Sequence, residues 1–158
     1  MPPRDKHLTR RLVLTGTTAT LALGALQRPT LAAYEDDGDD AAAIRNIAND
    51  RTIVADRVQL TLPELAENGN VVSLTVNVTS PMTAADHVKT IHIIASKNPL
   101  ANIARFHLGP RAGRARVQTN IRLATTQSVT ALAEMGDGTL WFGTATVLVT
   151  LSACLDGG

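Results

Sequence analysis

The chain has 158 residues, with 15 basic and 14 acidic side chains and aromatic residues at only 3% of positions. Proteins that bind nucleic acids usually present a basic surface with aromatic side chains that stack on bases, so this composition argues against that class. The single cysteine excludes a disulfide within the chain and leaves one thiol that can bond to another molecule.

Residues 1–32 have the features of an export signal. Arg10 and Arg11 form a twin-arginine pattern, and the weakly apolar run 16–26 that follows is too short and too polar to span a bilayer. Small residues at its end form a cleavage site before Ala33. We therefore predict export to the periplasm by the twin-arginine route, with no membrane segment in the mature form. Removing this segment leaves ten basic and thirteen acidic residues, so the mature chain is acidic.

Residues 33–50 are predicted to form an acidic leader followed by one short helix. The helix covers 41–48, which is rich in alanine and has two isoleucines three residues apart. Asp39 or Asp40 is its expected N-cap, because an aspartate there can accept a hydrogen bond from a free backbone amide.

Residues 51–151 alternate apolar and polar side chains between turn residues, which is typical of β-strands. Gly136-Asp137-Gly138 predicts a hairpin, and the last strand either runs unbroken or divides near Gly143. We predict an all-β fold, an immunoglobulin-like antiparallel β-sandwich of about seven strands with a short N-terminal helix. The predicted strands are 58–62, 71–78, 88–95, 101–108, 115–123, 128–134 and 140–153.

The only cysteine, Cys154, lies in a C-terminal arm of mostly small residues. Alternation along the last strand places Cys154 on the more polar face, opposite Leu151 and Ala153, so the thiol should point away from the core. We predict covalent attachment of a small group at Cys154. Nearby carboxylates disfavour the thiolate, so an activating positive charge is expected to come from a partner's surface. The predicted arm comprises Ser152, Ala153, Cys154, Leu155, Asp156, Gly157 and Gly158.

Five arginines occur within the eighteen residues that surround the connection 109–113. Arg111 and Arg114 are the candidate contacts for an oxyanion, through paired hydrogen bonds from their guanidinium groups; the alternative is an ordinary solvated strand face. No metal site and no cofactor are predicted, because the histidines lack the spacing of metal ligands. The common hydrolase, metalloprotease and phosphate-loop motifs are also missing, so we predict that the protein is not an enzyme.

Several stretches of the chain, together with the signal, the β-sandwich and the C-terminal cysteine, resemble SoxY, the sulfur-carrier subunit of the periplasmic thiosulfate-oxidising system. The resemblance spans roughly residues 40–154. The stretches that carry it are 62–69, 80–83, 106–113, 121–127 and 133–138.

This resemblance implies a non-catalytic carrier whose Cys154 holds sulfur intermediates covalently and presents them to periplasmic sulfur-oxidising enzymes. It also implies a heterodimer with a SoxZ-like β-sandwich subunit. The SoxY arm reads Gly-Gly-Cys-Gly-Gly, whereas residues 152–156 read Ser-Ala-Cys-Leu-Asp, which is similar to a SoxY-related subgroup with Ala-Ala-Cys-Ile-Glu. Leu155 and Asp156 would stiffen the arm, so the identity of the carried group stays open.

Two other functions stay open at this point. The protein could be a binding or scaffolding β-sandwich in which Cys154 only forms a disulfide-linked dimer between chains. It could also be an enzyme that uses the arginine cluster.

Overall fold

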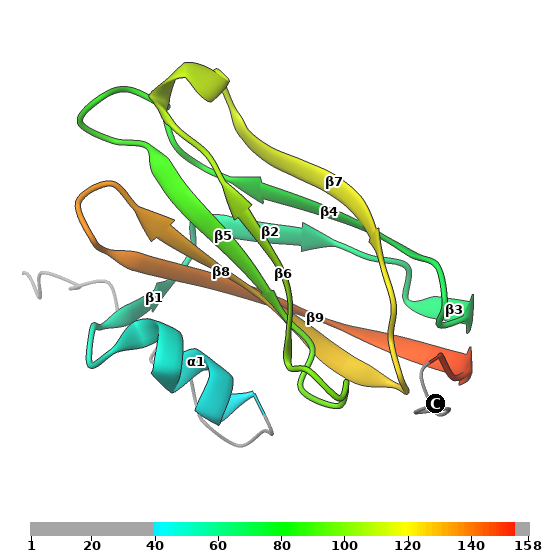
Figure 1. Cartoon of the computed structure of the whole chain (residues 1–158). Helices are drawn as coiled ribbons and strands as arrows, with labels where there is room; N and C mark the ends of the chain where they lie inside the picture. Colours follow the sequence, from blue (N-terminus) through cyan, green and yellow to red (C-terminus); the bar gives the residue numbers. More distant parts are fainter. Residues whose placement is uncertain (1–39, 154–158) are drawn as a thin grey trace, which may run out of the picture. The chain divides into compact units, whose positions relative to one another are not determined.

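The computed structural model of the chain describes residues 40–153, which form two packed β-sheets and one α-helix (Figure 1). The predicted signal peptide, the acidic leader up to residue 39 and the arm from Cys154 onward lie outside the described residues. The elements in chain order are α1 (Ala41–Ala48), β1 (Ile53–Ala55), β2 (Val58–Thr61), β3 (Leu65–Asn68), β4 (Val72–Val78), β5 (Val88–Ile94), β6 (Asn102–His107), the 3₁₀ helix η1 (Pro110–Ala112), β7 (Ala115–Ile121), β8 (Gln127–Met135) and β9 (Leu140–Leu151).

The larger sheet has the strand order β1-β9-β8-β5-β6, with β3 added along β9, and the smaller sheet has the order β2-β4-β7. The predicted all-β sandwich with a short helix is confirmed, and every pairing among the seven predicted strands is antiparallel. The sequence did not predict β1 and β3, which both pair with β9 in parallel. β9 runs unbroken through Gly143.

The core between the sheets follows from alternation along the strands. In β4 the four apolar side chains at alternate positions, Val72, Leu74, Val76 and Val78, are all buried. They pack with fully buried residues of β5 and β8, such as Ile91. Burying a side chain of this size contributes roughly 1.5–3 kcal/mol to the free energy of folding, so burial at these positions stabilises the packing of the two sheets.

Helix α1 covers part of the outer face of the larger sheet, where Ile44 and Ala48 pack in one cluster with Leu132 and other apolar residues. Asp40 occupies the N-cap position, as predicted, but its carboxylate makes no capping hydrogen bond. Instead its Oδ2 accepts a hydrogen bond from Thr130 Oγ1 of β8 at 3.1 Å, which fixes the start of the helix to the sheet. Within residues 40–153 no helix has the length and apolar character needed to cross a membrane.

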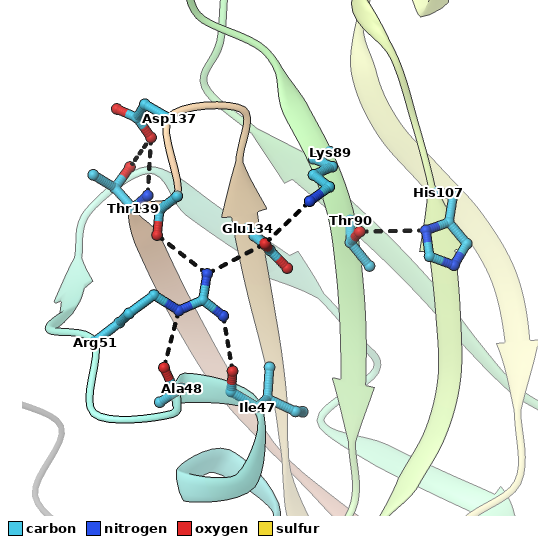
Figure 2. Close-up of polar contacts among 10 residues, drawn as sticks. Ile47, Ala48, Arg51, Lys89, Thr90, His107, Glu134, Asp137 and Thr139 are labelled. Carbon is cyan, nitrogen blue, oxygen red and sulfur yellow. Dashed lines mark hydrogen bonds and ion pairs between the residues drawn. The ribbon is translucent and has the colours of Figure 1, made fainter.

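Arg51 fixes the other end of α1. Its Nε and Nη2 donate to the carbonyl oxygens of Ala48 and Ile47, each at 2.9 Å, while Nη1 donates to Glu134 Oε1 and to Gly138 O, each at 3.2 Å (Figure 2). One guanidinium group therefore ties the last turn of the helix to β8 and to the β8–β9 hairpin.

The β8–β9 hairpin is closed by the predicted turn at 136–138. Gly138 has a φ of +87°, a conformation that favours glycine. Asp137 Oδ1 accepts hydrogen bonds from the backbone N–H of Thr139 at 2.9 Å and from its hydroxyl at 2.7 Å. These two hydrogen bonds lower the pKa of Asp137, because they favour the ionised carboxylate.

Candidate functional site

The base of the C-terminal arm is the end of β9, where the strand changes partner. Up to Val147, β9 pairs antiparallel with β8. Beyond it, Leu148, Val149 and Leu151 pair in parallel with β3. On the side of β9 where β8 ends, Thr126 provides the next hydrogen-bond partner: its hydroxyl accepts a hydrogen bond from the N–H of Val149 at 2.9 Å. The chain is therefore held on both sides as it approaches the arm.

Three backbone hydrogen bonds fasten the residues just before Cys154. Gly69 N–H donates to Leu151 O at 2.8 Å, Leu123 N–H donates to Gly69 O at 2.8 Å, and Ala153 N–H donates to Leu123 O at 3.1 Å. We call this set, formed by Gly69, Leu123, Leu151 and Ala153, the arm clasp. Ala153 is only 2% exposed, so the chain is attached to the sandwich up to the residue before the cysteine.

The arm clasp requires a glycine at position 69. A Cβ placed there would collide with Leu123 O and lie 3.0 Å from both Ala153 N and Val149 Cγ1. Because two of these neighbours are backbone atoms, they cannot move aside without disturbing the clasp. Gly69 lies in a turn between Asn68 and Asn70, in which Asn68 Oδ1 accepts a hydrogen bond from Asn70 N at 2.9 Å.

A side-chain network positions the segment that carries Leu123. Asn98 Oδ1 accepts hydrogen bonds from Ala124 N at 2.8 Å and from Gln127 Nε2 at 3.0 Å, and Asn98 Nδ2 donates to Arg122 O at 2.7 Å. Gln127, which is buried, also accepts a hydrogen bond from Lys97 N at 3.0 Å. The two loops at this end of the sandwich are thus joined, and together they hold the carbonyl that receives Ala153.

The predicted arm residues fall on both sides of the described boundary. Ser152 is exposed and Ala153 is buried, so of the two arm residues that the structure describes, one is exposed. Cys154, Leu155, Asp156, Gly157 and Gly158 lie outside the described residues, as do Arg10 and Arg11 of the predicted signal.

The alternation predicted for the last strand breaks near its end. Val147 and Ala153 are buried as expected, but Leu151 is 66% exposed. The break coincides with the change of partner, since Leu151 pairs only with Asn68 of β3. Leu65 and Leu148, which lie opposite each other across β3 and β9, are exposed as well.

Lys97 and Arg122 are two cationic residues at the same end as the arm clasp. Both side chains are exposed, and Lys97 Nζ donates to Thr126 O at 3.4 Å. No local pattern in the sequence marks Lys97, because only the folded loops bring it beside the segment that follows β7.

Arg111 and Arg114 are not brought to the arm clasp. They belong to the connection before β7, which begins at Ala115 opposite Val78. The clasp lies beyond the other end of β7, and a seven-residue strand spans roughly 20 Å. Figure 1 shows this connection and the end of β9 at opposite ends of the sandwich. Both side chains are exposed, and their role as anion contacts stays a prediction.

The histidines of the described residues, His87, His92 and His107, do not form a cluster of metal ligands. Within residues 40–153, no three His, Cys, Asp or Glu side chains are placed to hold a metal ion. His92 is buried on β5, and burial, followed by the charge of Arg105, lowers its pKa. His107 Nδ1 lies 3.3 Å from Thr90 Oγ1 (Figure 2).

Comparison with known proteins supports the fold and the family. The structure of the sulfur carrier protein SoxY from Chlorobium limicola f thiosulfatophilum matches with a TM-score of 0.58 and 28% identity, over 70% of this chain and 94% of that chain. A superoxide reductase (neelaredoxin) from Ignicoccus hospitalis matches with a TM-score of 0.52 and 17% identity, over 60% of this chain and 81% of that chain. At that identity the second likeness shows the fold alone. No curated protein matches the chain.

The family model described as sulfur oxidation protein SoxY matches residues 44–154, which include the whole β-sandwich and end on Cys154. This match and the SoxY structure agree on the same fold, and they support a sulfur-carrier role. The chain belongs to the SoxY family.

Proposed function

We propose that the protein carries sulfur intermediates as covalent adducts of Cys154 and presents them to sulfur-oxidising enzymes in the periplasm. Cys154 is the only thiol in the chain, and it follows directly after the arm clasp. The observation that carries this proposal is the attachment of Ala153, which is buried and hydrogen-bonded to Leu123, so the chain has a firm base at the residue directly before its single cysteine.

The chemistry of attachment defines what the partner must supply. A bond between Cys154 Sγ and a thiol-level sulfur of the attached group converts two thiol-level sulfurs to a disulfide-level pair, which releases two electrons and the protons of any thiols involved. The chain has a single cysteine, so it holds no second thiol or disulfide that could take up these electrons. The proposal therefore assigns the oxidation to a partner enzyme, and the protein acts as the carrier.

We further propose that the mature chain is exported by the twin-arginine route and pairs with a SoxZ-like subunit. The twin arginines Arg10 and Arg11 and the small residues before Ala33 support export. Membership of the SoxY family supports the pairing, because in that family the carrier subunit and a SoxZ subunit work together. The non-glycine arm leaves the carried group to be identified by experiment.

Mass spectrometry of the protein taken from periplasm without reductant tests the carrier function. Cells should be grown on reduced sulfur compounds, and the C-terminal peptide that contains Cys154 should be mapped. We expect a mass increase that corresponds to added sulfur atoms on Cys154, reversible by a thiol reductant. The matched variant Cys154→Ser should carry no such mass.

Two outcomes would argue against the proposal. A free thiol on Cys154 under these growth conditions would contradict carriage. A dimer linked through Cys154 on a non-reducing gel, with no sulfur adduct, would favour the scaffold function instead.

A further inference from the structure

A crevice of about 450 Å³ lies between helix α1 and the outer face of the larger sheet. The helix contributes Ala43, Asn46 and Ile47, which fall on one side of it at spacings of three and four residues. The sheet contributes side chains from three neighbouring strands, namely His92 of β5, Asn102 and Arg105 of β6 and Glu134 of β8. None of these residues takes part in the arm clasp.

His92 and Arg105 form the polar side of the crevice. They lie directly opposite each other across the β5–β6 pair. His92 is only 5% exposed, and its Nδ1 lies 3.4 Å from Asn102 Nδ2. Because an amide nitrogen donates, Nδ1 accepts, and the proton of the neutral ring then lies on Nε2. The lowered pKa of His92 keeps the ring neutral near pH 7, so Nε2 and the guanidinium of Arg105 both present hydrogen-bond donors.

The charges around the crevice do not cancel. Its one carboxylate, Glu134, is paired with Arg51 at 3.2 Å and with Lys89 at 3.6 Å (Figure 2). Burial alone would raise the pKa of Glu134, but the hydrogen bond and charge of Arg51, together with Lys89, lower it, so this carboxylate stays ionised and compensated. Arg105 has no acidic partner among residues 40–153. A net positive charge is therefore left beside His92.

We propose that this crevice binds a small organic anion, such as a carboxylate or sulfonate with an apolar body. The anionic group would bind Arg105, whose planar guanidinium matches two oxygens of such a group, and would accept a further hydrogen bond from His92. The apolar body would lie against Ala43 and Ile47 of the helix. Ligand sites combine an apolar lining with few polar groups in just this way, and they typically have volumes of about 300–1,000 Å³. This proposal is independent of the carrier function of Cys154.

Calorimetric titration of the full chain with benzoate tests the site, because benzoate combines a carboxylate with an apolar ring. We expect saturable binding with a Kd of about 1 mM or tighter. Benzamide, which has the same shape without the charge, should bind about tenfold more weakly or not at all. Sulfate is the control for inorganic anions. Because it lacks an apolar body, it should not displace benzoate.

Three variants locate the binding. Arg105→Gln should weaken benzoate at least about tenfold, because it removes the charge-assisted hydrogen bonds. Arg116→Gln is the matched control: Arg116 is exposed on β7 of the other sheet, and its loss should leave the affinity unchanged. Ala43→Phe should also abolish binding by filling the crevice, and circular dichroism should show that α1 and the sheets persist.

The proposal is overturned if benzoate shows no saturation up to about 10 mM, a range that covers weak binding by small ligands. It is also overturned if Arg105→Gln binds benzoate as well as the unaltered chain does. Displacement of benzoate by sulfate at equal concentration would contradict the organic class of ligand.

Discussion

Ala153 donates its backbone N–H to the carbonyl oxygen of Leu123 at 3.1 Å, and a side chain at Gly69 would strike that same oxygen. If Cys154 carries sulfur as proposed, a partner enzyme must approach the body of the sandwich for as long as the clasp holds, because Cys154 directly follows Ala153 in the chain. If the clasp opens, the segment available to the enzyme becomes longer.

Gly69→Ala tests the close packing of the arm clasp. The added methyl group overlaps the backbone of Leu123, so we expect a loss of about 1–3 kcal/mol in the free energy of unfolding. Denaturant unfolding measures the loss, and faster hydrogen exchange at Ala153 N–H would show that it arises at the clasp. Gly109→Ala is the control, because nothing lies within 4 Å of a Cβ there. Equal stabilities for the two variants would contradict the packing argument.

Asn98→Ala tests whether the loop network supports the clasp. The substitution removes three hydrogen bonds and leaves the amide of buried Gln127 without one of its partners. Because an unsatisfied buried polar group costs about 1–3 kcal/mol, we expect a loss of about 2–3 kcal/mol in unfolding free energy. Asn120→Ala is the comparison, since Asn120 is exposed and its side chain accepts a hydrogen bond from Ser73 Oγ at 3.1 Å. Its loss should change stability by no more than about 0.5 kcal/mol.

The sandwich could be predicted from the sequence because its main strands alternate clearly and end at turn residues. β4 shows this well, with buried side chains at every second position. The strands β1 and β3 could not be predicted in the same way. They have three and four residues, which is too short for an alternation of buried and exposed side chains to be recognised. Each forms because its backbone can pair with the far longer β9.

The candidate site was only partly predictable for a similar reason. Sequence proximity placed Arg111 and Arg114 in one group with Arg105 and Arg122, but strands β6 and β7 carry these residues to different parts of the molecule. Burial of Ala153 followed from alternation, whereas the exposure of Leu151 did not, because it depends on the change of partner from β8 to β3. Local patterns report which face of a strand is buried and not which strand lies beside it.

Arg51→Met tests the attachment of helix α1. The guanidinium makes four hydrogen bonds, to Ile47, Ala48, Glu134 and Gly138, so we expect a loss of about 1–3 kcal/mol in unfolding free energy and faster hydrogen exchange in the last turn of α1. Arg51→Lys should recover little of it, because an ammonium group lacks the planar fork that reaches all four oxygens. Full recovery by lysine would mean that the charge alone holds the helix.

His92 should make the stability of the protein depend on pH below neutrality. Burial and Arg105 lower its pKa in the folded state, whereas in the unfolded chain it titrates near the ordinary value of about 6.5. As the pH falls through about 6.5, the unfolded chain therefore binds a proton at His92 that the folded chain resists, and the free energy of unfolding decreases. Unfolding in urea between about pH 7.5 and 5.5 measures this slope above the range in which most carboxylates titrate.

The variant His92→Gln should flatten that slope, because it removes the group that binds the extra proton on unfolding. Arg105→Gln should flatten it in part, since the charge of Arg105 is the second cause of the lowered pKa of His92, after burial. Glu134 should not obscure the result. Because the pKa of Glu134 is lowered, its contribution to stability is fully present at pH values above the ordinary pKa of a glutamate. That contribution is lost only as the pH falls below this value. A stability profile for His92→Gln that runs parallel to that of the unaltered chain would show that His92 takes its proton equally well in both states.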